Sequence, residues 1–189
     1  MKRTILLILV VFVAVISRAQ NTNGVAIGDK APTFTAVTDD GSTWKLADYV
    51  GKKNVVVYFY PAAMTGGCTK QACAYRDAQP AIESANAVVV GISGDNVDGL
   101  KLFKKAENLN FTLLSDQTGE IAKSFGVPLK DGGTITREVE SKSYDLVRGA
   151  TASRWTFIID KKGNIVYKNE QVDAAKDAEA VLAFLKNSK

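Results

Sequence analysis

The chain has 189 residues, of which 46% are hydrophobic and 23% are charged, and its formal net charge is +4. This length and composition are typical of one globular domain, and they exclude a disordered chain, a collagen-like fibre and a multi-span membrane protein. The sequence contains no histidine, which removes histidine-ligated metal or haem and Ser-His or Cys-His catalytic pairs. Its two cysteines are too few for a tetrahedral thiolate zinc site.

Residues 1–19 have the pattern of a secretory signal peptide. A basic start precedes the uncharged apolar run 5–16, which is shorter than the ~20 residues of a membrane span. Ser17 and Ala19 then supply a small-x-small ending. We therefore expect export to the periplasm, cleavage after Ala19 and a short linker over 20–27. The alternative is that the segment stays uncleaved as an N-terminal anchor.

The basic charge belongs largely to this leading segment. Lys2, Arg3 and Arg18 lie in it, which leaves a net charge of +1 for residues 20–189. The other lysines and arginines are scattered along the chain rather than clustered. We therefore expect no nucleic-acid partner and no stable membrane partner.

The first half of the domain alternates between buried-strand and helix patterns. Residues 55–60 are a dense β-branched and aromatic run that ends at Pro61, which indicates a central strand. A helix is expected over 69–84, with a kink or break at Pro80. A second buried strand, a helix and a short strand are then expected over 87–92, 98–108 and 111–114.

The second half ends in a hairpin and a helix. A helix is expected to open at 115–118 and stop near Gly126, and a third buried strand covers 155–159. The turn 160–163 leads into a strand at 165–167, and an amphipathic helix follows over 174–187. This order predicts one α/β domain over residues 28–189 with a thioredoxin-like fold, a central mixed sheet flanked by helices.

One long polar stretch, residues 129–153, interrupts this pattern and is expected to be a loop. A loop longer than about 12–15 residues is usually functional or mobile. The alternative is a tolerated surface insertion.

Cys68 lies where the loop after the central strand enters the predicted helix. The N–H groups and dipole at a helix start favour a thiolate over a thiol. Thr65, three residues earlier, offers a hydroxyl that accepts a hydrogen bond from a backbone N–H or donates one to an incoming oxygen. Gly66 and Gly67 let the backbone approach a ligand closely.

Cys73 follows Cys68 by five positions. On a continuous helix this spacing places the two Cα atoms roughly 8–9 Å apart, whereas a disulfide needs them within about 7 Å. The pair therefore suits a redox cycle between a folded dithiol and a locally unwound disulfide. A small structural disulfide remains the alternative. The spacing also disfavours a C-x-x-C oxidoreductase.

At these residues the chain resembles the peroxiredoxins. Pro61-x-x-x-Thr65-x-x-Cys68 matches their active-site pattern, and the longer match is similar to the bacterioferritin comigratory protein, or Q-type, subgroup. The resemblance rests on three stretches, residues 28–34, 58–77 and 154–160.

The resemblance implies a thiol-dependent peroxidase that reduces hydrogen peroxide and organic hydroperoxides without a metal or organic cofactor. Cys68 is then the peroxidatic nucleophile and becomes a sulfenic acid. Cys73 is the resolving thiol, which condenses with it to an intramolecular disulfide in the atypical two-cysteine manner. The expected partners are the peroxide substrate and a thioredoxin-like or other dithiol reductant, and the expected state is a monomer.

The same resemblance assigns roles around the sulfur. Thr65 positions the peroxide, Arg154 supplies positive charge beside the thiolate, and Pro61 shields the pocket. The backbone amides of Gly67 and Cys68 hold the peroxide. Such a site needs a thiolate and preorganised groups for developing negative charge.

Several features depart from the family pattern or leave choices open. Arg148 and Arg76 compete with Arg154 for the role of the activating cation. Gly66 stands where the family commonly has proline, which predicts a looser loop. The stretch 62–64 replaces a typically charged one, so we expect a less polar approach and a preference for apolar organic hydroperoxides.

Two other functions fit parts of the sequence. An exported thiol-disulfide oxidoreductase on the same fold predicts exchange with protein dithiols and a slow reaction with peroxide. A non-catalytic exported binding domain predicts an inert Cys68–Cys73 disulfide.

Overall fold

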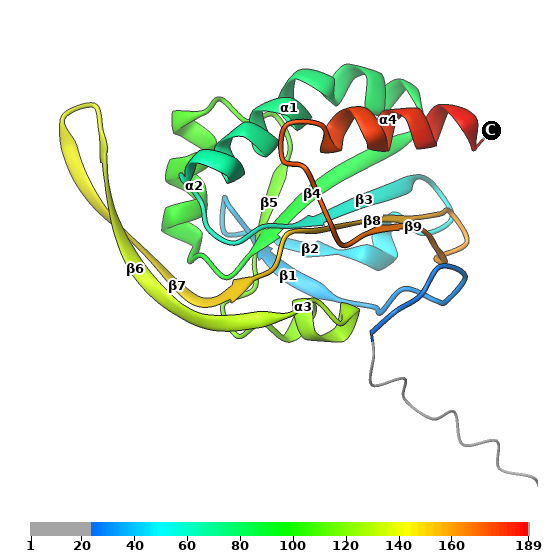
Figure 1. The fold of residues 1–189 in the computed structure, drawn as a ribbon, viewed down its shortest axis with the longest axis horizontal. Helices are drawn as coiled ribbons and strands as arrows, with labels where there is room; N and C mark the ends of the chain where they lie inside the picture. The colour runs from blue at the N-terminus through cyan, green and yellow to red at the C-terminus, as the bar shows by residue number, and fades with distance from the viewer. Residues whose placement is uncertain (1–23, 189) are drawn as a thin grey trace, which may run out of the picture.

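The computed structural model describes residues 24–188 and contains a seven-stranded mixed sheet in the order β2-β1-β5-β4-β3-β8-β9 (Figure 1). The order of its helices and strands confirms the predicted thioredoxin-like α/β fold. The predicted signal peptide and cleavage site lie outside the described residues, as do residues 20–23 of the predicted linker. Of the remaining linker, Val25 packs against the core.

The centre of the sheet is formed by β3 (Asn54–Phe59), β4 (Ala87–Ser93) and β8 (Trp155–Ile159), as predicted. β3 pairs in parallel with β4 and antiparallel with β8. Its successive side chains alternate between two buried clusters, one on each face of the sheet. Burial on both faces explains why this strand is a continuous apolar run in the sequence.

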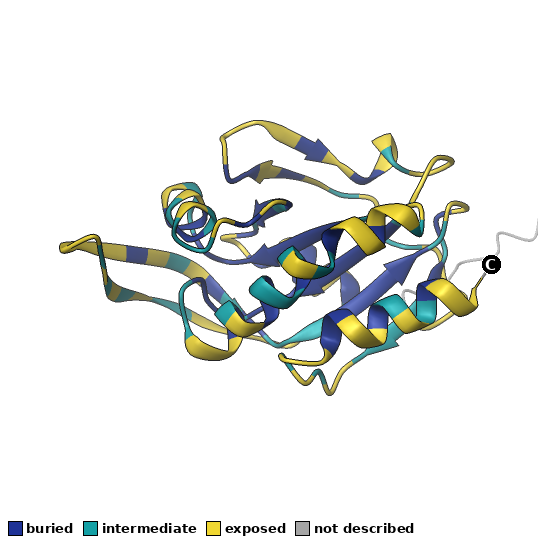
Figure 2. Cartoon of the chain, turned by 90° about the horizontal axis from the view of Figure 1, so that it is seen from above, coloured by how far each residue is buried: buried dark blue, intermediate teal, exposed yellow. Residues whose placement is uncertain are grey.

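Helices cover both faces of the sheet (Figure 1), and from above the helices carry exposed residues while the strands beneath them are buried (Figure 2). α1 (Gly66–Ser84), α2 (Val97–Ala106) and α4 (Asp177–Asn187) contribute to one core cluster, and α3 (Glu120–Phe125) contributes to the other. Among the helices of residues 24–188, none is both long and apolar enough to cross a membrane. Residues before α4 that were expected in the helix form a turn, in which Ala175 N–H donates to Asp173.

The remaining strands of the sheet lie outside this centre: β1 (Thr35–Thr38), β2 (Thr43–Lys45), β5 (Thr112–Ser115) and β9 (Ile165–Asn169). Of these, β5 and β9 were predicted, whereas the short strands β1 and β2 were not. A one-turn 3-10 helix (Leu46–Asp48) follows β2.

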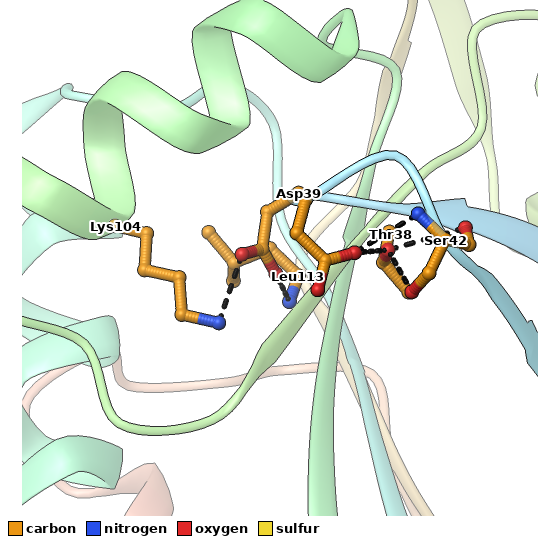
Figure 3. Close-up of polar contacts among 6 residues, drawn as sticks. Thr38, Asp39, Ser42, Lys104 and Leu113 are labelled. Atoms are coloured by element: carbon orange, nitrogen blue, oxygen red, sulfur yellow. Dashed lines mark hydrogen bonds and ion pairs between the residues drawn. The ribbon is translucent and has the colours of Figure 1, made fainter.

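The turn between β1 and β2 is anchored to the rest of the domain by Asp39 (Figure 3). Its carboxylate is buried, pairs with Lys104 of α2 at 2.8 Å, and accepts the N–H of Leu113 at 2.9 Å. Within the turn, hydrogen bonds from Thr38 and Ser42 lower the pKa of Asp40. The missed hairpin is therefore held by long-range polar contacts that no local pattern encodes.

The break expected at Pro80 is wrong, because α1 continues past it to Ser84. A proline leaves the carbonyl four residues earlier without its helical donor. Here that carbonyl belongs to Arg76, and it accepts a hydrogen bond from Nδ2 of Asn110 at 3.1 Å. The side chain thus replaces the missing backbone bond.

The loop expected over 129–153 is also wrong. The segment is a two-stranded antiparallel ribbon of β6 (Leu129–Val139) and β7 (Lys142–Ala152), whose tip projects away from the domain (Figure 1). Both turn residues, Glu140 and Ser141, have positive φ. Midway along the ribbon, where it pairs with Ile135, Leu146 is fully buried in the core cluster that contains α2. The ribbon is therefore a part of the fold with regular backbone pairing.

Candidate functional site

The site is built on the loop that joins β3 to α1. Pro61 follows the central strand and is half-buried, and Thr65 is the N-cap residue of α1 with extended backbone. Helix α1 begins at Gly66, three residues earlier than predicted. Cys68 therefore lies in the first turn, where backbone N–H groups have no partner within the helix. The predicted position of the Cys68 thiol at a helix start is confirmed.

Two contacts from distant segments fix this loop. The backbone N–H of Ala63 donates to Oδ2 of Asp95 at 2.8 Å, and Nε of Arg137 in β6 donates to the carbonyl oxygen of Met64 at 2.9 Å. Asp95 is buried after β4, and desolvation raises its pKa despite the hydrogen bonds from Ala63 and Ser93. Met64 has a φ of 56°, a conformation that costs energy unless it is held.

Cys68 is a free thiol that is 2% exposed. Nη2 of Arg154 donates a hydrogen bond to its Sγ at 3.3 Å. The same guanidinium nitrogen would lie 3.3 Å from a Cβ added at Gly67, so a side chain there would crowd the arginine. The glycine thus leaves room for the cation that stabilises negative charge on the sulfur.

The other two candidate arginines lie elsewhere in the described chain. Arg148 bonds Thr151 of its own strand. Arg76 pairs with Asp77 and donates to the carbonyl oxygen of Glu107. Arg154, just before β8, is therefore the arginine that the fold brings to Cys68.

The hydroxyl of Thr65 points back into its own loop. It donates to the carbonyl oxygen of Ala62 at 2.9 Å and makes no helix-capping bond. Because its one proton is used in this way, its free lone pairs accept hydrogen bonds. The geometry favours a threonine that accepts the O–H of a hydroperoxide over one that donates to it.

Cys73 lies on the same unbroken helix and is also a free thiol. It is half-buried, and its Sγ donates to Oε2 of Glu107 at 3.6 Å. Burial raises its pKa, and the charge of Glu107 adds to this effect while Arg76 opposes it. The two sulfurs therefore have different surroundings: Cys68 accepts a hydrogen bond from a guanidinium, whereas Cys73 donates one to a carboxylate and has Arg76 nearby.

Two residues of the site, Gln71 and Asp177, were not among the predicted ones. Oε1 of Gln71 accepts a hydrogen bond from Nη1 of Arg154, and Nε2 of Gln71 donates to Oδ2 of Asp177 at 2.7 Å. Gln71 follows Cys68 by three positions on α1, and this helical spacing was a usable signal. An acidic residue in the first turn of a helix is common, so the sequence gave no signal that Asp177 belongs to the site.

The expected apolar lining of the approach is only partly correct. Ala62 and Ala63 are 5% and 0% exposed and form part of the buried core of the loop. Met64 alone of the three is half-buried and packs against the core cluster beside Cys68. Any effect of this stretch on peroxide choice therefore acts through Met64.

No group of three or more potential metal-ligating side chains is found within residues 24–188. The chemistry that the described residues offer is that of a buried sulfur nucleophile, a guanidinium and backbone amides.

The chain is similar in sequence to a known protein family and to its characterised members. The AhpC/TSA family profile matches residues 27–168. A chloroplastic peroxiredoxin Q of Populus jackii is 41% identical over 162 residues, which cover 85% of this chain and 68% of the relative.

Solved structures of related proteins also align with this chain. The peroxidoxin BcpB of Mycobacterium tuberculosis aligns with a TM-score of 0.72 and 31% identity over 86% of this chain and 97% of that chain. The bacterioferritin comigratory protein of Xanthomonas campestris, studied for alkyl peroxide reduction, aligns with a TM-score of 0.67 and 26% identity over 82% of this chain and 91% of that chain. The range matched by the family profile includes both cysteines and Arg154 and ends before Asp177.

Proposed function

Because the chain belongs to the AhpC/TSA family and is a peroxiredoxin, a thiol-dependent peroxidase, we propose that it reduces peroxides through a Cys68 sulfenic acid and a Cys68–Cys73 disulfide. The observation that carries this proposal is the contact between Arg154 and the buried sulfur of Cys68, 3.3 Å apart at the start of α1. A buried thiol with a guanidinium and free helix N–H groups around it is arranged for negative charge.

In the first step, the Cys68 thiolate attacks one oxygen of the hydroperoxide. An S–O bond forms, the O–O bond breaks, and the departing oxygen takes up a proton and leaves as an alcohol or water. The sulfur is oxidised to a sulfenic acid and the peroxide is reduced. Arg154 and the amides of Gly67 and Cys68 stabilise the developing oxyanion, while Thr65 accepts the peroxide O–H.

In the second step, the Cys73 thiolate attacks the sulfenic sulfur. The S–S bond forms, the S–O bond breaks, and the hydroxide takes up a proton to leave as water. On the intact α1 the two Cα atoms are roughly 8–9 Å apart, so the helix must unwind locally between the cysteines. A dithiol reductant of the thioredoxin type then restores both thiols by exchange.

The cellular compartment in which the protein acts is inferred from residues 1–19. We propose export with cleavage after Ala19, so the electron donor is a dithiol protein in the periplasm. The protein acts as a monomer in this proposal. N-terminal sequencing of the protein from a periplasmic fraction, and its mass in solution by light scattering, test these two points. A first residue at Met1 or a stable dimer would contradict them.

The catalytic proposal is tested by stopped-flow oxidation of the reduced, signal-free protein with hydrogen peroxide and cumene hydroperoxide. The fluorescence of Trp155, which adjoins Arg154, follows the reaction, and mass spectrometry identifies the product. We expect a fast first phase, a slower second phase and a Cys68–Cys73 disulfide.

Two cysteine variants separate the steps. Cys68→Ser abolishes the reaction, whereas Cys73→Ser permits one oxidation and then stalls without an added thiol. If wild-type Cys68 reacts no faster than a free thiol, the peroxidase proposal is wrong, and rapid exchange with a protein dithiol would instead identify a disulfide oxidoreductase.

A further inference from the structure

Asp177, the first residue of α4, joins three elements of the site at one oxygen atom. Its Oδ2 accepts hydrogen bonds from Gln71 Nε2, Tyr75 Oη and Thr156 Oγ1, each at 2.7 Å. Gln71 and Tyr75 belong to α1, while Thr156 lies in β8 two residues after Arg154. The carboxylate thus contacts α1, which carries both cysteines, and β8, which begins directly after Arg154.

The hydrogen-bond donors and acceptors of these groups determine how the Gln71 amide is oriented. A carboxylate only accepts hydrogen bonds, so Gln71 must present its NH2 group to Asp177. The carbonyl end of the same amide then faces Arg154 and accepts from its Nη1, while Nη2 of Arg154 donates to Cys68. An acceptor at Asp177 therefore determines where the guanidinium points.

This carboxylate is costly for the fold. Asp177 is 2% exposed, and within residues 24–188 it forms no ion pair and its Oδ1 has no hydrogen-bond partner. A buried charge destabilises a protein unless other charges or dipoles compensate it. Arg154 is the positive charge that the network supplies, one amide group away. An apolar side chain would pack α4 without this cost.

We propose that Asp177 is a positioning residue that aims Arg154 at Cys68 through Gln71 and holds the segment between the two cysteines in the helix. The inference rests on the proposed two-step reaction. Gln71 lies between Cys68 and Cys73, so unwinding that segment for the disulfide breaks its bond to Asp177. The same contact then favours the first step and opposes the second.

The first test measures both phases in Asp177→Asn. The introduced amide no longer dictates the orientation of Gln71. We expect oxidation of Cys68 to slow about tenfold and disulfide formation to become several-fold faster. Tyr75→Phe is the matched control, because it removes one donor to the same oxygen and leaves Gln71 in place. It should leave the oxidation rate unchanged.

If Asp177 only stabilised the fold, Asp177→Asn would give a different result. Loss of a stabilising contact lowers the melting temperature, yet it leaves the rate constants of the protein that remains folded unchanged. Opposite changes in the two phases would therefore identify positioning. Equal rates in wild type and Asp177→Asn would overturn the proposal.

The second test concerns the relay from Asp177 through Gln71 to Arg154. It exchanges the hydrogen-bond donor and acceptor between positions 71 and 177. Gln71→Glu alone places two carboxylates face to face and should slow oxidation. Combined with Asp177→Asn, the introduced amide donates to the introduced carboxylate, which accepts from Arg154. We expect the double variant to recover the wild-type oxidation rate within about twofold. A double variant as slow as the slower single variant would contradict the relay.

A third readout does not depend on peroxidase activity. In the reduced protein, ¹⁵N NMR of the Arg154 guanidinium, assigned by its loss in Arg154→Lys, reports hindered rotation of a group hydrogen-bonded at both nitrogens. Asp177→Asn should restore fast rotation, and the double variant should hinder it again. Slow oxidation of wild type would reject the proposed function, while these spectra would still decide the role of Asp177. Unchanged spectra in Asp177→Asn would overturn it.

Discussion

Arg137 of the projecting ribbon donates a hydrogen bond through Nε to the carbonyl oxygen of Met64, at 2.9 Å. Met64 has a φ of 56° and immediately precedes Thr65, the N-cap of the helix that carries Cys68. The ribbon is therefore connected to the loop that shapes the candidate peroxide site. Arg137 and Asp95 hold this loop through neighbouring backbone groups, the carbonyl of Met64 and the N–H of Ala63.

Removing this contact should slow the first chemical step. Arg137→Gln loses a charged donor to a half-buried carbonyl, an interaction worth about 1–2 kcal/mol, and lets the loop sample other conformations. We expect the rate of Cys68 oxidation by hydrogen peroxide to fall about fivefold in stopped-flow fluorescence. Lys142→Gln, on the exposed part of the same ribbon, is the control and should react like wild type. Equal rates for both variants would show that the ribbon does not position the loop.

Peroxide choice should depend on Met64, the half-buried apolar side chain of the loop. Met64→Asn keeps a residue that tolerates positive φ but removes the apolar surface. We expect the rate with cumene hydroperoxide to fall about threefold more than the rate with hydrogen peroxide, because a bulky apolar substrate loses more contact. A common change in both rates would mean that Met64 affects the loop and not the substrate.

The ion pair between Asp39 and Lys104 should matter for stability (Figure 3). Lys104→Met leaves the buried carboxylate of Asp39 with the N–H of Leu113 as its remaining contact. Because Lys104 is partly exposed, we expect the free energy of unfolding in urea to fall by about 2 kcal/mol, below the range for a fully buried pair. Lys101→Met, on the exposed side of α2, should change it by less than about 0.5 kcal/mol. Similar losses in both variants would assign the effect to α2 in general.

The local parts of the site could be predicted from the sequence, and the distant contacts could not. The apolar run before Pro61 and the small residues before Cys68 define a strand, a loop and a helix start within one short stretch. The turn at Glu140 and Ser141 was missed because neither is a residue that usually favours positive φ, so the ribbon read as a loop.

Contacts between residues far apart in the sequence were also beyond prediction. The resemblance assigned the role of activating cation to Arg154, but Arg148 and Arg76 remained competitors until the fold brought Arg154 to the sulfur. Asp177 lies 106 positions from Gln71, and no periodicity links one carboxylate to one amide over that distance. Its burial depends on how α4 packs on α1, which is a tertiary property.

The continuity of α1 through Pro80 can be tested by a double-mutant cycle. Asn110→Ala removes the side chain that donates to the carbonyl oxygen of Arg76, and it should lower the free energy of unfolding by about 1 kcal/mol. In a Pro80→Ala background the introduced alanine supplies the missing backbone N–H. There the loss of Asn110 should cost less than half as much. The same cost in both backgrounds would show that Asn110 acts independently of the proline.

The pH dependence of disulfide formation should reflect the surroundings of Cys73. Burial, and then the charge of Glu107, raise the pKa of this thiol above its ordinary value of 9.0, against the effect of Arg76. The folded state therefore favours the protonated thiol. That stabilisation is complete below the ordinary pKa of 9.0, which the unfolded chain has, and is lost as pH rises through the higher pKa of the fold.

Only the thiolate attacks the sulfenic acid, so the second phase of oxidation should accelerate with rising pH and level off above pH 9.0. Glu107→Gln removes a negative charge and should lower the pKa of Cys73. The plateau then moves to lower pH and disulfide formation near neutral pH becomes about threefold faster, since more thiolate is present. The rate of the first phase, which belongs to Cys68, should stay the same. Glu83→Gln, an exposed change farther along α1, should leave both phases unaltered, and an unshifted profile in Glu107→Gln would mean that the carboxylate does not control the resolving thiol.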